Sequence, residues 1–209
     1  PGFFAETGAG LTDVSFGSST LGDVNGDGTL DLVITGFDQN NNETTTLYLG
    51  DGSGGFTKAN AGLTDVSFGS STLGDVDGNG TLDLVITGLD QNNNETTTLY
   101  LGDGDGGFSE ANAGLTSSVN GSSTLGDVDG DGDLDLVITG YDGSNRTATL
   151  YLGDGNGGFT KANAGLTGVR FSSSTMGDVD GDGDLDLVIT GDDGSNRTAA
   201  LYLGDGNGG

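Results

Sequence analysis

The chain has 209 residues, of which 44 are glycine, and its 32 acidic and five basic residues give a net charge of −27. Histidine, cysteine and tryptophan are absent, which excludes disulfides, zinc sites built from cysteine and histidine, and thiol or imidazole catalysis. The charge argues against nucleic acid or an anionic membrane as a partner, because both are polyanions. No apolar run approaches the roughly 20 residues of a membrane helix.

In chain order, the first 60 residues or so predict four short strands. Small polar residues form the first at Ser18–Leu21, and an apolar run forms the second at Leu30–Thr35. The third is Thr45–Leu49, and the fourth begins at Phe56. Clusters of glycine, asparagine and aspartate separate them, and no window has helical periodicity. The apolar second strand is typical of a strand covered on both faces.

This pattern occurs four times. The motif G-D-V-x-G-x-G-x-L-D-L-V-I-T-G begins at residues 22, 74, 126 and 177, so the spacings are 52, 52 and 51. Four antiparallel strands in each repeat of about 50 residues are the unit of a β-propeller blade. The sequence therefore predicts an all-β propeller of four blades in a single domain, 1–209, with repeats at about 4–55, 56–107, 108–158 and 159–209.

The two ends of the sequence complement each other. Phe4 aligns with Phe56, so we expect residues 1–10 to supply the outer strand that the last repeat lacks. Four blades can close into a ring alone, or two chains can form an eight-bladed ring as a homodimer. The small inner strands favour a tight four-bladed ring, but four blades is the lower limit of natural propellers, and the balance favours the dimer. No secretory signal peptide is recognisable, so we expect a mature form, a fragment or an engineered chain.

A loop rich in oxygen-bearing side chains lies between the first two strands of every repeat, with the pattern D-x-[DN]-x-[DN]-G-x-x-D. Alternate side chains of such a tight loop point at one centre, and Ca²⁺ takes six to eight oxygen ligands. Position seven would give a backbone carbonyl. Position nine would close the site, because position twelve is isoleucine here rather than the glutamate of an EF-hand. Aspartate and glycine are also ordinary turn residues, but four loops in register favour a metal.

These loops hold 16 of the 32 acidic residues, and packing them without cations would be self-repulsive. We therefore predict about four Ca²⁺ ions per chain. The predicted ligands are Asp23, Asn25, Asp27, Thr29 and Asp31; Asp75, Asp77, Asn79, Thr81 and Asp83; Asp127, Asp129, Asp131, Asp133 and Asp135; and Asp178, Asp180, Asp182, Asp184 and Asp186.

With these loops in place, nearly the whole chain resembles the FG-GAP/VCBS repeats of integrin-type propellers. Phe16-Gly17 and Phe68-Gly69 match the FG element, whereas Asn120-Gly121 and Phe171-Ser172 depart from it, and Ile-Thr-Gly replaces the GAP element. The resemblance implies an extracellular or cell-surface propeller with one Ca²⁺ per blade, used for recognition or adhesion. Some fungal lectins have a similar propeller, but no match carries their sugar-binding residues to this chain.

Positions that vary within a nearly uniform repeat are candidates for a ligand surface. They lie directly after the Ile-Thr-Gly element, in the hairpin that follows it, and before the inner strand at residues 13–16, 65–68, 117–120 and 168–171. The alternative is drift, because exposed hairpins tolerate change. The candidate ligand-binding residues are Phe37, Leu89, Tyr141, Asp192, Arg146 and Arg197.

Two hypotheses of function follow. The first is a calcium-stabilised extracellular module that recognises a glycan or a protein surface. The second is a structural or engineered repeat scaffold with no ligand of its own, which the near identity of the first two repeats favours. We do not expect an enzyme, because carboxylates are the only acid or base groups available and most of them lie in the metal loops.

Overall fold

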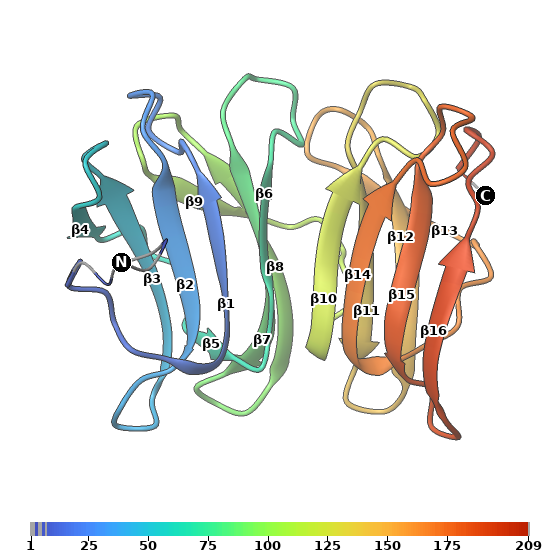
Figure 1. Ribbon diagram of the computed structural model, residues 1–209, viewed down its shortest axis with the longest axis horizontal. Helices are drawn as coiled ribbons and strands as arrows, with labels where there is room; N and C mark the ends of the chain where they lie inside the picture. The colour runs from blue at the N-terminus through green and yellow to red at the C-terminus, as the bar shows by residue number, and fades with distance from the viewer. Residues whose placement is uncertain (1–2, 4–5, 7, 209) are drawn as a thin grey trace.

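The computed structural model describes residues 3, 6 and 8–208, and these residues form strands and no helix. Four antiparallel sheets, one for each repeat, are arranged as the blades of a four-bladed β-propeller (Figure 1). This confirms the predicted all-β propeller. Within the described part of the chain there is accordingly no helix long and apolar enough to cross a bilayer.

In each blade the strands lie side by side in chain order, from the inner strand outward. The first blade contains β1 (Ser15–Gly22), β2 (Asp31–Phe37), β3 (Glu43–Gly50) and β4 (Phe56–Ala59). The second contains β5 (Val66–Ser67), β6 (Ser71–Gly74), β7 (Asp83–Asp90), β8 (Glu95–Gly102) and β9 (Phe108–Ala111). The third contains β10 (Val119–Gly126), β11 (Asp135–Tyr141), β12 (Arg146–Gly153) and β13 (Phe159–Ala162). The fourth contains β14 (Arg170–Gly177), β15 (Asp186–Asp192) and β16 (Arg197–Tyr202).

The inner strands are longer than predicted and irregular. In β1 the pairing with β2 shifts between Ser15 and Ser18, which is the signature of a β-bulge. Gly17 lies in this bulge, where a Cβ atom would overlap the backbone carbonyl of Thr35. In the second blade the same irregularity divides the inner strand into β5 and β6, both paired with β7. The FG element therefore marks a bulge that allows the inner strand to bend.

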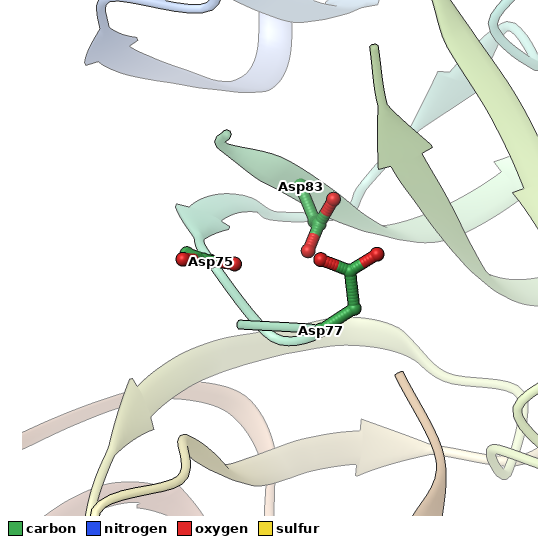
Figure 2. Close-up of side chains that lie close together, drawn as sticks. All are labelled: Asp75, Asp77 and Asp83. Carbon is green, nitrogen blue, oxygen red and sulfur yellow. The ribbon is translucent and has the colours of Figure 1, made fainter. Parts of the chain in front are cut away.

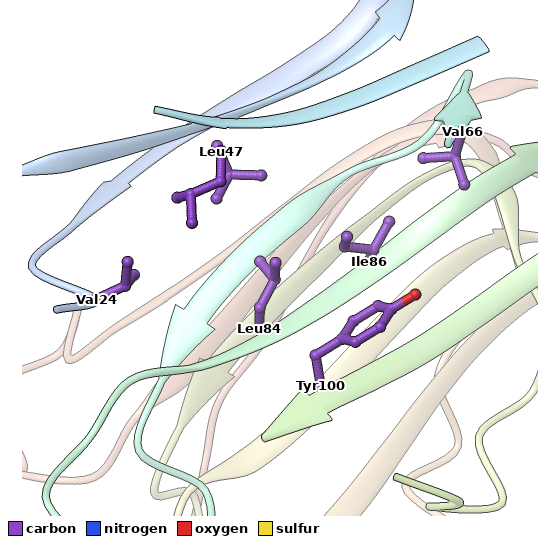
Figure 3. Close-up of a cluster of buried hydrophobic side chains, with 7 residues drawn as sticks. Val24, Leu47, Val66, Leu84, Ile86 and Tyr100 are labelled. Carbon is purple, nitrogen blue, oxygen red and sulfur yellow. The ribbon is translucent and has the colours of Figure 1, made fainter. Parts of the chain in front are cut away.

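The core lies between blades, as the apolar second strands predict. Val24 and Leu47 of the first blade pack against Leu84, Ile86 and Tyr100 of the second (Figure 3). Two equivalent clusters join the second blade to the third and the third to the fourth. The second and third blades therefore bury apolar residues on both faces, whereas the first and fourth each have one neighbouring blade.

A repeated tyrosine ties each blade to the segment that enters it. The Tyr100 hydroxyl accepts a hydrogen bond from the Thr64 amide (2.9 Å) and pairs with the Thr64 hydroxyl (2.8 Å). Tyr48 and Thr12 make the same contacts in the first blade. These contacts extend over about 36 residues of chain, so they fix the position of the connection before each inner strand.

The predicted closing strand at residues 1–10 is not tested, because residues 1, 2, 4, 5 and 7 lie outside the described part of the chain. Within the described part, the fourth sheet has three strands. The inner strands pack in the order β1, β6, β10, β14, and no comparable packing joins β14 to β1 among the described residues. The first and last blades accordingly lie at opposite sides of the molecule (Figure 1).

Candidate metal centres and ligand surface

The four loops that hold the predicted metal ligands, called the metal loops below, follow the inner strands and lie together at the upper end of the molecule in Figure 1. In three of them, positions one, three and nine bring carboxylate oxygens within 4.8 Å of one another. Figure 2 shows one such group, with its three carboxylates around the inside of the loop. The groups are Asp75, Asp77 and Asp83; Asp127, Asp129 and Asp135; and Asp178, Asp180 and Asp186.

The aspartate at position nine is the buried member of each group, with about 1% of its surface exposed. In the second blade, Asp83 Oδ2 accepts a hydrogen bond from the Val76 amide (2.8 Å), and Oδ1 accepts one from the Gly102 amide (2.9 Å). The same two bonds occur in the other three blades. Position nine therefore joins the metal loop to the end of the third strand, besides facing the other carboxylates.

The side chain of the aspartate at position one shapes the loop by accepting hydrogen bonds from the loop's backbone amides. Asp75 Oδ1 accepts a hydrogen bond from the Asn79 amide (3.1 Å), and Oδ2 accepts one from the Gly80 amide (2.8 Å). The glycine at position six has positive φ in every repeat, 87° at Gly80, as the predicted sharp turn requires. The loop is thus closed around its first carboxylate by its own amides.

Position five lies outside the converging groups. The side-chain oxygen of Asp27 accepts hydrogen bonds from the amide (2.8 Å) and hydroxyl (2.6 Å) of Thr29. The side-chain oxygen of Asn79 likewise accepts a hydrogen bond from the Thr81 amide. In the first repeat, position three is Asn25, so Asp23 and Asp31 are the only carboxylates at positions one, three and nine of that loop. The part of positions five and seven in metal binding stays a prediction.

In two of the three groups the electrostatics favour a bound cation, whereas in the fourth blade the Val179 and Gly204 amides lower the pKa of Asp186. Burial raises the pKa of Asp83, against hydrogen bonds from the Gly102 and Val76 amides, and the negative charge of Asp77 raises it further. Burial likewise raises the pKa of Asp135, and repulsion from Asp129 and Asp131 adds to it. A divalent cation among these oxygens would relieve both costs. Carboxylate oxygen is the ligand of hard cations such as Ca²⁺ rather than of soft metals.

The candidate ligand residues gather at the opposite end of the blades. Phe37, Leu89, Tyr141 and Asp192 occupy equivalent, half-buried positions at the ends of β2, β7, β11 and β15. Arg146 begins β12, and its side chain reaches the next blade, where Nη2 lies 3.3 Å from Asp192 Oδ1 and Nε donates to the Asp192 carbonyl (3.1 Å). Arg146 and Asp192 are therefore paired with each other, whereas Arg197 is exposed.

Sequence reasoning pointed to the variable segment before each inner strand at this end but not to its backbone strain. The non-glycine residues of the inner-strand bulges adopt the left-handed region, with φ of 51° at Phe16, 54° at Phe68, 55° at Asn120 and 49° at Phe171. Such strain costs of order 1–3 kcal/mol and clusters at functional sites. The Phe68 ring contacts those of Phe16 (centroids 4.9 Å apart) and Phe37 (5.3 Å, edge to face). The variability of residues 13–16 between repeats was the available signal.

The comparison with protein families agrees with these observations. The model of the FG-GAP-like repeat matches three times, at residues 23–86, 75–138 and 127–189. Each match runs from the metal loop of one blade to the second strand of the next, so together they extend over most of the chain. No curated protein matches the chain. The chain belongs to the family of FG-GAP-like repeat proteins.

Proposed function

We propose that this protein is a calcium-stabilised, extracellular binding module of the adhesion type, which recognises a glycan or a protein surface. The family match supports a binding propeller, and the converging aspartates support Ca²⁺. The residues at positions one, three and nine of each loop would hold the ion. Bound Ca²⁺ supplies positive charge to the buried carboxylates and so stabilises the loop between the first two strands.

In this proposal the ligand binds at the end of the blades opposite the metal loops. The observation on which it rests is that four different side chains, Phe37, Leu89, Tyr141 and Asp192, occupy one equivalent half-buried position on one end of the blades. The Phe68 ring contacts the rings of Phe37 and Phe16 at this end. Aromatic faces with neighbouring polar groups suit both sugars and protein surfaces.

Calcium acts on recognition indirectly in this proposal. The seven residues of β2 separate the metal loop from Phe37, which is roughly 20 Å at 3.3 Å per residue. No ligand at one end can touch an ion at the other over this distance. Calcium dependence of binding would therefore arise from the stability of the blades.

The proposed role is not catalytic. Histidine and cysteine are absent from the sequence, and the buried aspartates are engaged by backbone amides. No group remains as an obvious general acid or base. Turnover of a glycoside by the purified protein would contradict this part of the proposal.

The test is a binding screen on a glycan array and against cell-surface extracts, in calcium and in chelator. We expect calcium-dependent hits that weaken at least tenfold in Phe37→Ala and Tyr141→Ala. Lys161→Ala is the matched control, because Lys161 is exposed on the outer strand β13, away from this end, and should bind as the unmodified protein does. Ligands that bind both aromatic variants as tightly as the unmodified protein would contradict the assigned surface.

The alternative is a repeat scaffold without a ligand. One observation favours it: between residues 11–56 and 63–108 only four positions differ. Selection for a specific ligand usually diversifies surface residues, whereas recent duplication or deliberate construction leaves them alike. A folded, calcium-loaded protein that binds nothing in either screen would favour the scaffold.

A further inference from the structure

The exposed outer face of the fourth blade is the first of two unpartnered surfaces. Val179, Leu201 and Leu203 are each more than half exposed, at 57%, 53% and 57%. Their equivalents in the first blade, Val24 and Leu47, are buried at 2% and 1% against the second blade. The fourth blade therefore presents, uncovered, the same apolar side chains that the other blades bury.

The second unpartnered surface is the face of the first blade that lies opposite its contact with the second blade. Leu21 and Leu30 are 55% and 59% exposed. Their equivalents in the second blade, Leu73 and Leu82, pack against the core of the first blade. The first blade thus exposes the side chains that every later blade inserts into its predecessor.

A repeated glycine shows that these two faces fit each other. A Cβ atom on Gly22 would lie 2.7–2.8 Å from the side chains of Leu82 and Leu73 of the next blade. Gly74 and Gly126 stand in the same relation to the third and fourth blades. Gly177, the fourth in the series, has no atom within 4 Å of that position. By the repeat, the leucines that belong there are Leu30 and Leu21 of another first blade.

A chain of serine hydroxyls near the propeller axis is interrupted at the same place. Hydroxyl pairs cross each blade junction at 2.6–3.1 Å; they are Ser18 with Ser71, Ser70 with Ser123, and Ser122 with Ser174. The next pair in the series would join Ser173 to Ser19, and no such bond forms within the chain's described residues. The missing pair has its two halves on the two unpartnered faces.

These faces point away from each other in one molecule. In Figure 1 the first blade extends to the left from β1 to β4, and the fourth extends to the right from β14 to β16. In a closed four-bladed ring they would be neighbours. Three junctions here leave the arc open, so both faces stay uncovered within one chain.

We propose that two copies of this chain join head to tail into a closed eight-bladed ring, with the fourth blade of each copy packed on the first blade of the other. Gly177 then receives Leu21 and Leu30 of the partner copy, and Ser173 pairs with Ser19. Each contact repeats one that already occurs three times within the chain. Each junction joins two different faces, and the two-fold axis of the ring relates one junction to the other, so the two junctions close it.

The accessible surface has the size that this assembly requires. The chain exposes 10203 Å², whereas a compact monomer of 20.7 kDa exposes roughly 8,900 Å². The excess is about 1,300 Å². A standard interface takes about 800 Å² from each partner, and the ring would take two such faces from each chain. The open arc therefore carries surface comparable to what the proposed junctions bury.

A cavity between the third and fourth blades fits the same partner. It is lined by Val128, Val137, Leu150, Met176, Leu187 and Tyr202. The equivalent places at the two preceding junctions are filled by Phe108 and Phe159. The cluster at this third junction contains no phenylalanine among the described residues, so the cavity is open to an apolar side chain of the partner copy.

The first experiment is the mass in solution, measured by light scattering in calcium. We expect twice 20.7 kDa, or 41.4 kDa, with no dependence on concentration in the micromolar range. A mass of 20.7 kDa would overturn the proposal in favour of a monomer. Larger species that grow with concentration would also overturn it, because they would show an open filament.

Substitutions on the two faces test the junction itself. Gly177→Val meets nothing within the chain, so it should fold normally and yet be monomeric. Leu21→Glu should also be monomeric, because it places a charge in the junction. Thr57→Glu adds the same charge on the outer strand β4, at a site whose equivalents Ser109 and Thr160 stay exposed at the closed junctions; it should remain a dimer.

Mixing the two disruptive variants is the sharpest test. A heterodimer of Leu21→Glu and Gly177→Val contains one junction with no substitution and one with both. The mixture should therefore regain dimers that neither variant forms alone, measurable as a rise in mass towards 41.4 kDa, twice 20.7 kDa. Two folded variants that stay dimeric when alone, or a mixture that gains no dimer, would contradict the head-to-tail ring.

Discussion

Asp135 at position nine of the third metal loop is predicted to have two separable roles. Its carboxylate accepts hydrogen bonds from the amides of Val128 (2.7 Å) and Gly153 (2.9 Å), and it also faces Asp127 and Asp129. Asp135→Ala leaves two amides without an acceptor, at about 1–3 kcal/mol each when they are buried. Removing a buried charge whose pKa burial raises offsets part of this cost. We expect a net loss of about 2–4 kcal/mol in chelator.

Asp129→Ala is the matched variant, because Asp129 belongs to the same group but accepts only the Asp131 amide at 3.2 Å. In chelator its removal should change stability by less than about 0.5 kcal/mol, since it also relieves repulsion on Asp135. In calcium both variants should lose the contribution of one site. That contribution is about 2.7 kcal/mol when free Ca²⁺ is 100 times its dissociation constant.

The assay is urea unfolding followed by circular dichroism, in chelator and in calcium, with an unchanged m-value as the check that compactness is unaltered. Asp135→Asn provides a further control, because the amide keeps one acceptor oxygen and should lose roughly half as much as alanine. Equal losses for Asp129→Ala and Asp135→Ala in chelator would refute the anchoring role. Equal stability of Asp129→Ala and the unmodified protein in calcium would refute the role of the group in binding metal.

Three further predictions concern the repeat as a whole. Tyr100→Phe should lower the free energy of unfolding by about 1–2 kcal/mol, because the Thr64 amide loses its acceptor; denaturant titration measures this. Turn carboxylates such as Asp51, whose pKa is lowered by the amide two residues on, stabilise the fold above their unfolded pKa of about 3.9. Their contribution is lost as pH falls through the lower folded value, so Asp51→Asn should flatten the loss of melting temperature below pH 4 in chelator. Calorimetric calcium titration should show a larger loss of affinity for Asp127→Ala than for Asp23→Ala, because the third loop has five acidic residues and the first has three.

The fold was predictable because its information is local and repeated. The apolar runs of the second strands and the turn clusters around them define a blade within one repeat, and four copies leave little ambiguity. The inner strands were predicted too short, since Gly17 and Phe16 form a bulge that no propensity scale anticipates. The angle between blades is set by packing across junctions, and therefore the choice between a closed ring and an open arc could not come from one repeat.

The spacing of the acidic residues predicted part of the geometry of these loops. In three loops the carboxylates of positions one, three and nine lie together, and their binding of a metal stays a prediction. The spacing did not anticipate that position five would turn to its own neighbour, as Asp27 does to Thr29. Nor did it reveal that Asp192 pairs with Arg146 of another blade, because that contact joins residues 46 positions apart.

The most direct test of a calcium-stabilised propeller is thermal unfolding in excess chelator, compared with millimolar Ca²⁺ and with millimolar Mg²⁺. Four sites at about 2.7 kcal/mol each give an upper contribution on the order of 11 kcal/mol, comparable to the whole stability of a typical domain. Even one site should move the melting temperature by about 5–10 °C in a chain of this size. We predict that chelator lowers the melting temperature by more than about 10 °C and that Ca²⁺, but not Mg²⁺, restores it. An identical melting curve in all three solutions would show that the loops are turns without a metal and would contradict the account.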